Sequence, residues 1–216
     1  MTVHISIDDV GQSLRLLAHE RPVSIFDSDF FALLKKWHNQ FNAKFTLYVF
    51  SDSFLLSDMP VEYTNDFHGN AQWLKWGYHG SSKLPFIEEL NYEEEFKLLD
   101  KAFDKLGAGK TDILRLHYWQ VSPEQKKFLH SKGITCLLYP DDDKLPYDCN
   151  DTFYEHGLPH LRTRVRFENI DTVNPETLAI GKNHIAAFTH EWCFPDIIMR
   201  MEESLRLYSK CGYRFI

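Results

Sequence analysis

The sequence has few cysteines, no long hydrophobic run and no excess of positive charge, and each absence excludes a class of protein. No apolar run approaches the roughly 20 residues that a membrane-spanning helix needs. A net charge of −7 argues against nucleic acid or an anionic membrane as the partner. Because the cysteines show no CxxC spacing, we expect reduced thiols; they are Cys136, Cys149, Cys193 and Cys211.

The sequence also shows no targeting signal and no internal repeat. The first residues show no basic segment followed by an apolar core, so no secretory signal is visible and we expect a cytoplasmic protein. An exported protein whose signal has been removed remains an alternative. No period of 20–50 residues repeats. The 216 residues, 44% of them hydrophobic, are ordinary for a globular protein, and we expect a single domain over 1–216 with the oligomeric state open.

Hydrophobic periodicity predicts strands that alternate with helices. Val3, Ile5 and Ile7 alternate with polar residues, which is typical of a strand over 3–7. We expect further strands over 44–50, 73–78, 112–118, 134–139, 161–167, 184–189 and 213–216, and helices over 28–40, 92–106, 123–132 and 195–210, with loop-rich stretches at 51–72 and 140–160. This alternation predicts mostly parallel strands, in an open doubly wound sheet or a closed barrel.

Ionisable residues lie at the ends of several predicted strands. Asp8 and Asp9 end the first strand, and two adjacent carboxylates repel each other unless a cation or a basic partner is near. A solvated turn is the simpler interpretation of this pair alone, as a structural role is for any single histidine. Strand ends converge on one face of a βα barrel, where active sites lie, so the joint placement favours the barrel; the residues are Asp8, Asp9, His79, Arg115, His117 and His190.

These side chains suit metal-assisted hydrolysis. Asp9, His79 and His117 are the predicted ligands of a divalent metal, with a position left open for water. Asp8 is the predicted general base. We expect Arg115 to hold Asp8 and to keep its pKa low, and His190 to act as the general acid.

Aromatic residues are plentiful, with 17 Phe, 10 Tyr and 5 Trp. Such numbers usually reflect core packing, but flat rings also stack on the apolar faces of sugars. Four aromatic residues follow or precede the strand-end residues, and we expect them to bind substrate at the mouth of the site; they are Tyr118, Trp119, Trp192 and Trp76. Glu191 either orients His190 or faces solvent.

Four motifs, in this order along the chain, resemble those of the polysaccharide deacetylase family, the NodB homology domain. They are Ser-Ile-Asp8-Asp9-Val, Gly77-Tyr78-His79-Gly80, Leu114-Arg115-Leu116-His117-Tyr118 and Ala187-Phe188-Thr189-His190-Glu191. The resemblance spans nearly the whole chain. It implies a distorted (β/α)7 barrel and metal-dependent hydrolysis, with zinc as the expected ion, of an N- or O-acetyl group on a carbohydrate.

The chain departs from the family's pattern at three positions. Lys83 stands where the second motif has its second histidine, His117 stands where the third motif has proline, and Val10 replaces glycine. His117 would restore the ligand that Lys83 cannot supply. The missing second histidine keeps open a non-catalytic carbohydrate- or ligand-binding protein on the same barrel. Two further alternatives stay open: a metal-dependent amide or ester hydrolase for a small molecule, and an unrelated α/β fold in which these residues never meet.

Overall fold

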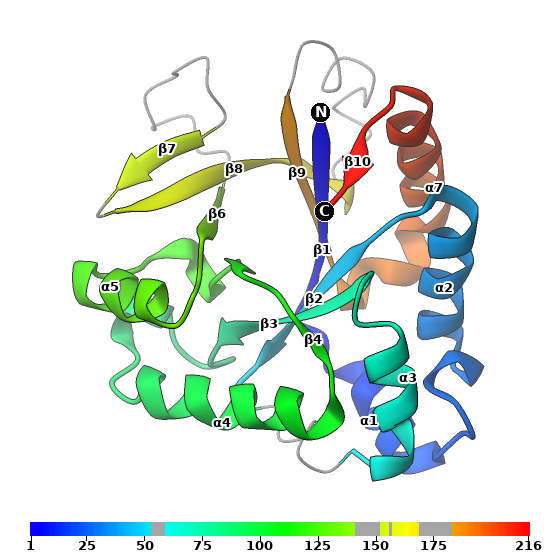
Figure 1. Ribbon diagram of the computed structural model, residues 1–216, viewed down its shortest axis with the longest axis horizontal. Helices are drawn as coiled ribbons and strands as arrows, with labels where there is room; N and C mark the ends of the chain where they lie inside the picture. The colour runs from blue at the N-terminus through cyan, green and yellow to red at the C-terminus, as the bar shows by residue number, and fades with distance from the viewer. Residues whose placement is uncertain (53–58, 141–151, 156, 169–182) are drawn as a thin grey trace.

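The computed structural model describes residues 1–52, 59–140, 152–155, 157–168 and 183–216, and the strands in these ranges form one curled sheet (Figure 1). Its order is β4-β3-β2-β1-β9-β8-β6-β5, with β10 paired to β1 and β7 paired to β8. All pairings are parallel except that of β7 with β8. The strands are β1 (Thr2–Asp8), β2 (Phe45–Phe50), β3 (Leu74–Gly80), β4 (Gly109–Lys110), β5 (Ile113–Leu114), β6 (Cys136–Pro140), β7 (Thr152–Glu155), β8 (Leu158–Arg166), β9 (His184–His190) and β10 (Arg214–Phe215).

Helices cover the outside of the curl (Figure 1). They are α1 (Gln12–Glu20), α2 (Asp29–Phe41), α3 (Thr64–Gly69), α4 (Tyr92–Leu106), α5 (Pro123–Ser131) and α7 (Phe194–Lys210). The architecture is the distorted α/β barrel that the sequence predicts. No helix in the described ranges is both long enough and apolar enough to cross a membrane.

The central strand β1 is buried on both faces. Val3, Ile5 and Ile7 are fully buried, as expected for a strand covered by helices. The alternate side chains, which include His4 and Asp8, are buried as well, and they face the inside of the curl. The apolar face of β1 packs against the helices, and its polar face points into the barrel. Asp8, at the carboxyl end of β1, therefore lies inside the barrel.

Trp76 belongs to the core rather than to a substrate site. It lies on β3 with 1% of its surface exposed, and its ring packs against Phe31 of α2, Phe67 of α3 and Phe103 of α4. The prediction that Trp76 binds substrate is therefore wrong. The cause is the strand's alternation: Trp76 occupies the helix-facing side of β3, opposite to the side that a barrel interior presents.

Most predicted elements are present, and the main differences are local. The predicted strand 112–118 is limited to Ile113–Leu114, and a 3-10 turn follows at His117–Trp119, in which Tyr118 has a positive φ of 57°. The hairpin of β7 and β8 lies partly within the stretch predicted as loop, and α1 was not predicted. Cys136, Cys193 and Cys211 are free thiols, whereas Cys149 lies outside the described residues.

Candidate active site

Asp8 and Arg115 form a buried ion pair inside the barrel. The Arg115 Nε contacts Asp8 Oδ2, and both side chains are almost fully buried. The guanidinium lies between two aromatic rings, 3.7 Å from the centroid of Trp119 and 3.2 Å from that of Phe188. Stacking of this kind suits the planar charge of arginine. Arg115 is thus held firmly where it faces Asp8.

The pKa of Asp8 shifts in the direction opposite to the one predicted. Burial raises the pKa of the Asp8 carboxyl, and the positive charge of Arg115 only partly offsets this effect. Burial likewise lowers the pKa of Arg115 to about 10, against the opposing influence of Asp8. The prediction that Arg115 keeps the Asp8 pKa low is wrong because the cost of desolvation in the barrel interior exceeds the gain from the pair.

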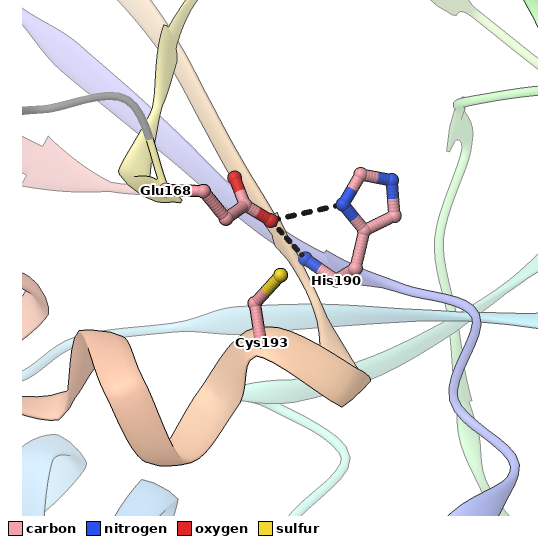
Figure 2. Close-up of side chains that lie close together, drawn as sticks. All are labelled: Glu168, His190 and Cys193. Atoms are coloured by element: carbon pink, nitrogen blue, oxygen red, sulfur yellow. Dashed lines mark hydrogen bonds and ion pairs between the residues drawn. The ribbon is translucent and has the colours of Figure 1, made fainter.

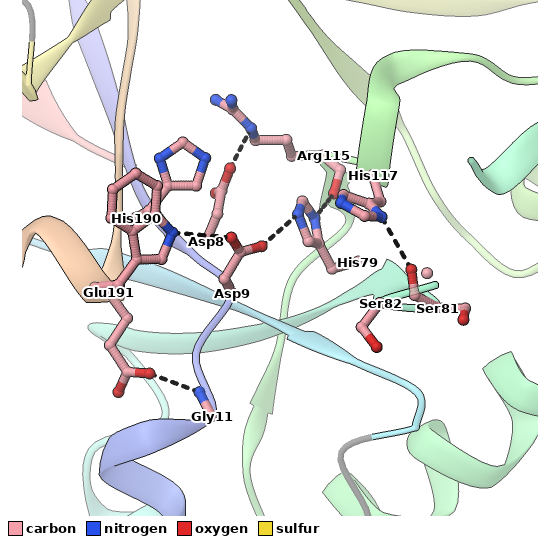
Figure 3. Close-up of polar contacts among 12 residues, drawn as sticks. Asp8, Asp9, Gly11, His79, Ser81, Ser82, Arg115, His117, His190 and Glu191 are labelled. Carbon is pink, nitrogen blue, oxygen red and sulfur yellow. Dashed lines mark hydrogen bonds and ion pairs between the residues drawn. The ribbon is translucent and has the colours of Figure 1, made fainter. Parts of the chain in front are cut away.

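Asp9 turns away from Asp8 and faces His79 (Figure 3). Its φ of 58° lies in the left-handed region, which aspartate tolerates better than most residues. Asp9 Oδ1 lies 3.3 Å from His79 Nε2, and the indole Nε1 of Trp192 donates to Asp9 Oδ2 at 3.3 Å. The two adjacent carboxylates therefore have different partners. Burial alone would raise the pKa of Asp9, but His79, His190 and Trp192 together outweigh burial, and the net shift is downward.

The tautomer of His79 follows from its other hydrogen bond. His79 Nδ1 lies 2.5 Å from the backbone carbonyl of Arg115, so Nδ1 carries a proton and donates it. In a neutral ring, the Nε2 lone pair then faces the oxygen of Asp9. Two lone pairs at this distance repel each other unless the ring takes up a second proton or a cation lies beside both atoms.

The geometry of this pair fits a divalent cation. Two ligand atoms each about 2.1 Å from a tetrahedral ion lie about 3.4 Å apart, close to the Asp9–His79 separation. Metal-binding histidines also donate their other ring N–H to a carbonyl or carboxylate, as His79 does. The donor set of one carboxylate oxygen and one imidazole nitrogen suits zinc and similar ions.

His117 lies beside this pair but does not join it within coordinating distance. Its ring centroid is 5.6 Å from that of His79, and its Nδ1 donates to the Ser81 carbonyl at 3.0 Å (Figure 3). Burial lowers the pKa of His117, with a further contribution from His79, which favours the neutral ring. Among the described residues, the atoms of Asp9, His79 and His117 do not meet as a group within 4.8 Å.

A buried glutamate holds the segment that positions His117. Glu89 accepts hydrogen bonds from the backbone N–H of Ser81 at 2.5 Å and from the Tyr78 hydroxyl at 2.9 Å. Gly80 has a φ of 101°, and a Cβ there would meet Glu89 Oε1 at 2.8 Å. Glycine is therefore required between His79 and Ser81. Lys83, two residues further on, is exposed and cannot replace a ligand in the barrel.

His190 lies beside Asp8 and is oriented by Glu168, a residue that the sequence analysis missed. β1 and β9 are paired in parallel with Asp8 opposite His190. Glu168 Oε1 accepts from His190 Nδ1 at 2.9 Å and from the His190 backbone N–H at 2.9 Å (Figure 2). Burial would raise the pKa of Glu168, but these hydrogen bonds lower it to about 2. With its proton on Nδ1, His190 leaves Nε2 free for proton transfer.

Glu168, His190 and Cys193 are the one group in the described ranges that brings three potential metal-ligand atoms within 4.8 Å. Two contacts argue against a cation there. Glu168 Oε1 also accepts from the Thr189 hydroxyl at 3.1 Å, and Arg166 Nε lies 3.1 Å from Glu168 Oε2. Burial raises the pKa of the Cys193 thiol to about 11. Within this group, Glu168 orients His190 through hydrogen bonds.

Glu191 neither orients His190 nor faces solvent. Its carboxylate is buried and accepts the backbone N–H groups of Gly11, Gln12 and Ser13, each at 2.7 Å. These N–H groups belong to the start of α1, where they have no partner within the helix. Glu191 therefore joins the end of β9 to the segment that follows Asp9.

Three of the predicted aromatic residues lie around the strand ends. Trp192 is 62% exposed and stacks on the His190 ring, with centroids 5.1 Å apart. Tyr118 is 56% exposed and packs against His117 at 4.1 Å. Trp119 is partly buried against Arg115. Trp192 and Tyr118 present accessible ring surface, while Trp119 helps to fix Arg115.

Known proteins resemble this chain in fold but not in sequence. No family model matches the chain, and no curated protein sequence matches it significantly. The 4-alpha-glucanotransferase from Thermococcus litoralis superposes with a TM-score of 0.64 at 12% identity over 100% of this chain. This chain spans only 37% of the length of that protein.

Two other solved structures match over most of their own length. The family 4 carbohydrate esterase from Streptomyces lividans, in complex with acetate, has a TM-score of 0.51 at 12% identity, and 96% of this chain covers 89% of that one. A protein assigned as a polysaccharide deacetylase from Mycobacterium smegmatis has a TM-score of 0.56 at 12% identity, with coverage of 96% and 84%. The fold is thus the barrel of polysaccharide deacetylases and carbohydrate esterases. At this identity, the likeness establishes the fold alone.

Proposed function

We propose that this chain is a metal-dependent hydrolase, a divergent member of the polysaccharide deacetylase family, which removes an acyl group from an amide or ester on a carbohydrate. The observation that carries the proposal is the arrangement of Asp9 and His79. Their facing atoms are separated as two ligands of one ion would be, and His79 is fixed in the tautomer that a ligand needs. The motif order in the sequence and the fold support the same conclusion.

Asp9 and His79 would hold the metal, with His117 as the nearest further donor. When bound, such an ion would polarise an acyl carbonyl and make water more acidic. Zinc is the ion that this donor set suits best. Asp9 Oδ2 remains tied to Trp192, so the indole fixes the orientation of the carboxylate.

Asp8 and His190 supply the proton transfers in this proposal. Asp8 is the general base: burial raises its pKa, and a carboxylate with a higher pKa is a stronger base. His190 is the general acid, because Glu168 holds its Nδ1 proton and directs Nε2 to the leaving group. Arg115 is a positioning residue that holds Asp8 through an ion pair and through its stacking between two aromatic rings.

The test is acetate release from N-acetylglucosamine oligomers and from O-acetylated xylan, measured after metal removal and after reconstitution with zinc or cobalt. We expect activity that a chelator abolishes. Asp8→Asn and His190→Ala should each lower kcat by about 100-fold or more, whereas Glu203→Gln on the exposed face of α7 should leave it unchanged. Full activity in both site variants would overturn the assignment.

A non-catalytic carbohydrate-binding protein is the second candidate. It is favoured by one specific observation: in the described residues His117 does not complete a three-atom group with Asp9 and His79, and Lys83 offers no substitute. Elemental analysis and zinc titration by calorimetry separate the two functions without any activity assay. Binding of about one zinc per chain that Asp9→Ala and His79→Ala both abolish supports the hydrolase. Failure to bind zinc, together with binding of oligosaccharide, supports the second candidate.

A further inference from the structure

A groove of about 530 Å³ lies on the same side of the barrel as the strand-end residues. It runs between α1, the start of α2 and the segment from Glu191 to Ile198. Trp192 lines it, and the indole of Trp192 donates to Asp9. The groove therefore borders the candidate active site at Trp192. Its volume falls within the roughly 300–1,000 Å³ of typical ligand pockets.

Half of the residues that line the groove are apolar, and they form an apolar wall. Leu16 of α1, Phe30 and Leu33 of α2, and Ile198 of α7 belong to it, together with the ring of Trp192. Leu16 is 45% exposed and Trp192 is 62% exposed, so this surface is accessible rather than packed away. An accessible aromatic ring flanked by aliphatic side chains suits a ligand with a flat C–H face.

The charge of the groove has one sign. Glu20, Asp27 and Asp29 line it, and no Lys, Arg or His does. The fourth acid, Glu191, is already neutralised by the three N–H groups at the start of α1. Glu20, Asp27 and Asp29 are exposed, and none of them has an ion pair to a basic side chain among the described contacts. The groove therefore attracts a cation that also carries apolar surface.

We propose that this groove binds an amino-sugar unit with a free ammonium group, adjacent to the acylated unit at Asp9. The inference rests on the proposed function and names its substrate class: an oligosaccharide that is already partly deacylated. Hydrolysis of an N-acyl group releases an amine, which takes up a proton near neutral pH. The apolar face of such a sugar stacks on Trp192, and its ammonium group pairs with Asp29 and Glu20.

Binding of the glucosamine trimer tests the proposal without turnover, because that ligand has no acyl group to lose. Calorimetry compares it with the N-acetylglucosamine trimer, which has the same length but no charge, at a slightly acidic pH where the amines are protonated. We expect the cationic trimer to bind at least 10-fold more tightly. Its affinity should fall several-fold between low and high salt, since exposed charges are screened.

Charge-neutralising variants locate the site. The double variant Asp29→Asn/Glu20→Gln should weaken binding of the cationic trimer by about 5- to 10-fold, as expected for the loss of two exposed charge contacts. It should leave binding of the N-acetylated trimer unchanged. Glu94→Gln is the matched control, because Glu94 is an exposed acid in the first turn of α4, as Asp29 is in α2, and does not line the groove.

The outcomes distinguish the groove from the proposed function. Equal affinity for both trimers, or unchanged binding in the double variant, overturns the groove assignment even if the chain releases acetate. Tight binding of 1,8-diaminooctane without binding of the glucosamine trimer overturns the sugar class. If the glucosamine trimer binds in a charge-dependent way and the double variant loses this binding, the assignment of the groove is supported. This holds even if the chain releases no acetate and the hydrolase proposal is rejected.

Discussion

At the scale of single residues, Glu168 determines how His190 can act. We predict that Glu168→Gln lowers kcat for acyl hydrolysis by about 100-fold with a small change in KM, because the amide no longer fixes the proton on Nδ1. The dependence of kcat on pH should change its shape, which a merely structural role would not cause. Glu168→Asp, which keeps the charge, should restore part of the rate. An unchanged pH profile in Glu168→Gln would contradict this role.

The sequence predicted which residues meet at Asp8 but not their electrostatic balance. Asp8 and Arg115 are 107 positions apart, and their placement at strand ends was enough to predict contact. The direction of the Asp8 pKa shift depends on how deeply the Asp8–Arg115 pair is buried. A local sequence pattern does not predict that depth. Glu168 was missed although it directly follows the predicted strand 161–167, so the rule that selected Asp8 and His190 would also have selected it.

At the scale of elements, α1 depends on a side chain distant in sequence. We predict that Glu191→Gln destabilises the protein by about 1–3 kcal/mol, because a buried carboxylate accepting three backbone N–H groups is replaced by a neutral amide. Urea unfolding followed by circular dichroism measures the change. Glu203→Gln, an exposed position on α7, is the control and should be neutral. Equal stability of the two variants would show that Glu191 does not cap α1.

The same dependence explains which elements the sequence could predict. α4 begins and ends at the predicted residues, because its apolar positions recur at helical spacing and Gly107 ends it in the left-handed conformation. Helix α5 was found from local signals too, a serine cap followed by proline. In α1 no side chain of the N-cap residue Gly11 can cap the helix, and Glu191 supplies that contact from the far end of the chain. Local patterns cannot predict such an element.

At the scale of the whole molecule, the order of the strands in the sheet cannot be read from any single segment of the sequence. Alternation of strands and helices predicted a parallel sheet, and the barrel was favoured because polar residues gather at the strand ends. What the alternation could not predict is that β1 lies between β2 and β9, which places the first and last motifs side by side. This closure brings His190 next to Asp8 and creates the polar interior.

The polar interior makes stability depend on pH through His4. His4 is fully buried, and neither ring nitrogen has a hydrogen-bond partner in the described part of the chain. Burial lowers its pKa from 6.5 to about 4. The unfolded chain therefore binds the proton more tightly than the folded one, and acid favours unfolding. The contribution of the neutral ring is fully present above pH 6.5 and is lost as the pH falls through about 4.

We predict that the wild type loses up to about 3 kcal/mol more stability than His4→Asn between those two pH values, since each pKa unit is worth about 1.4 kcal/mol. Urea unfolding at a series of pH values gives both curves, and their difference removes the contribution of carboxylates common to both proteins. His19→Asn, at an exposed position of α1, should leave the wild-type curve unchanged. Parallel curves for the wild type and His4→Asn would mean that His4 is hydrated or paired in the folded protein, and that the interior of the barrel tolerates its charge.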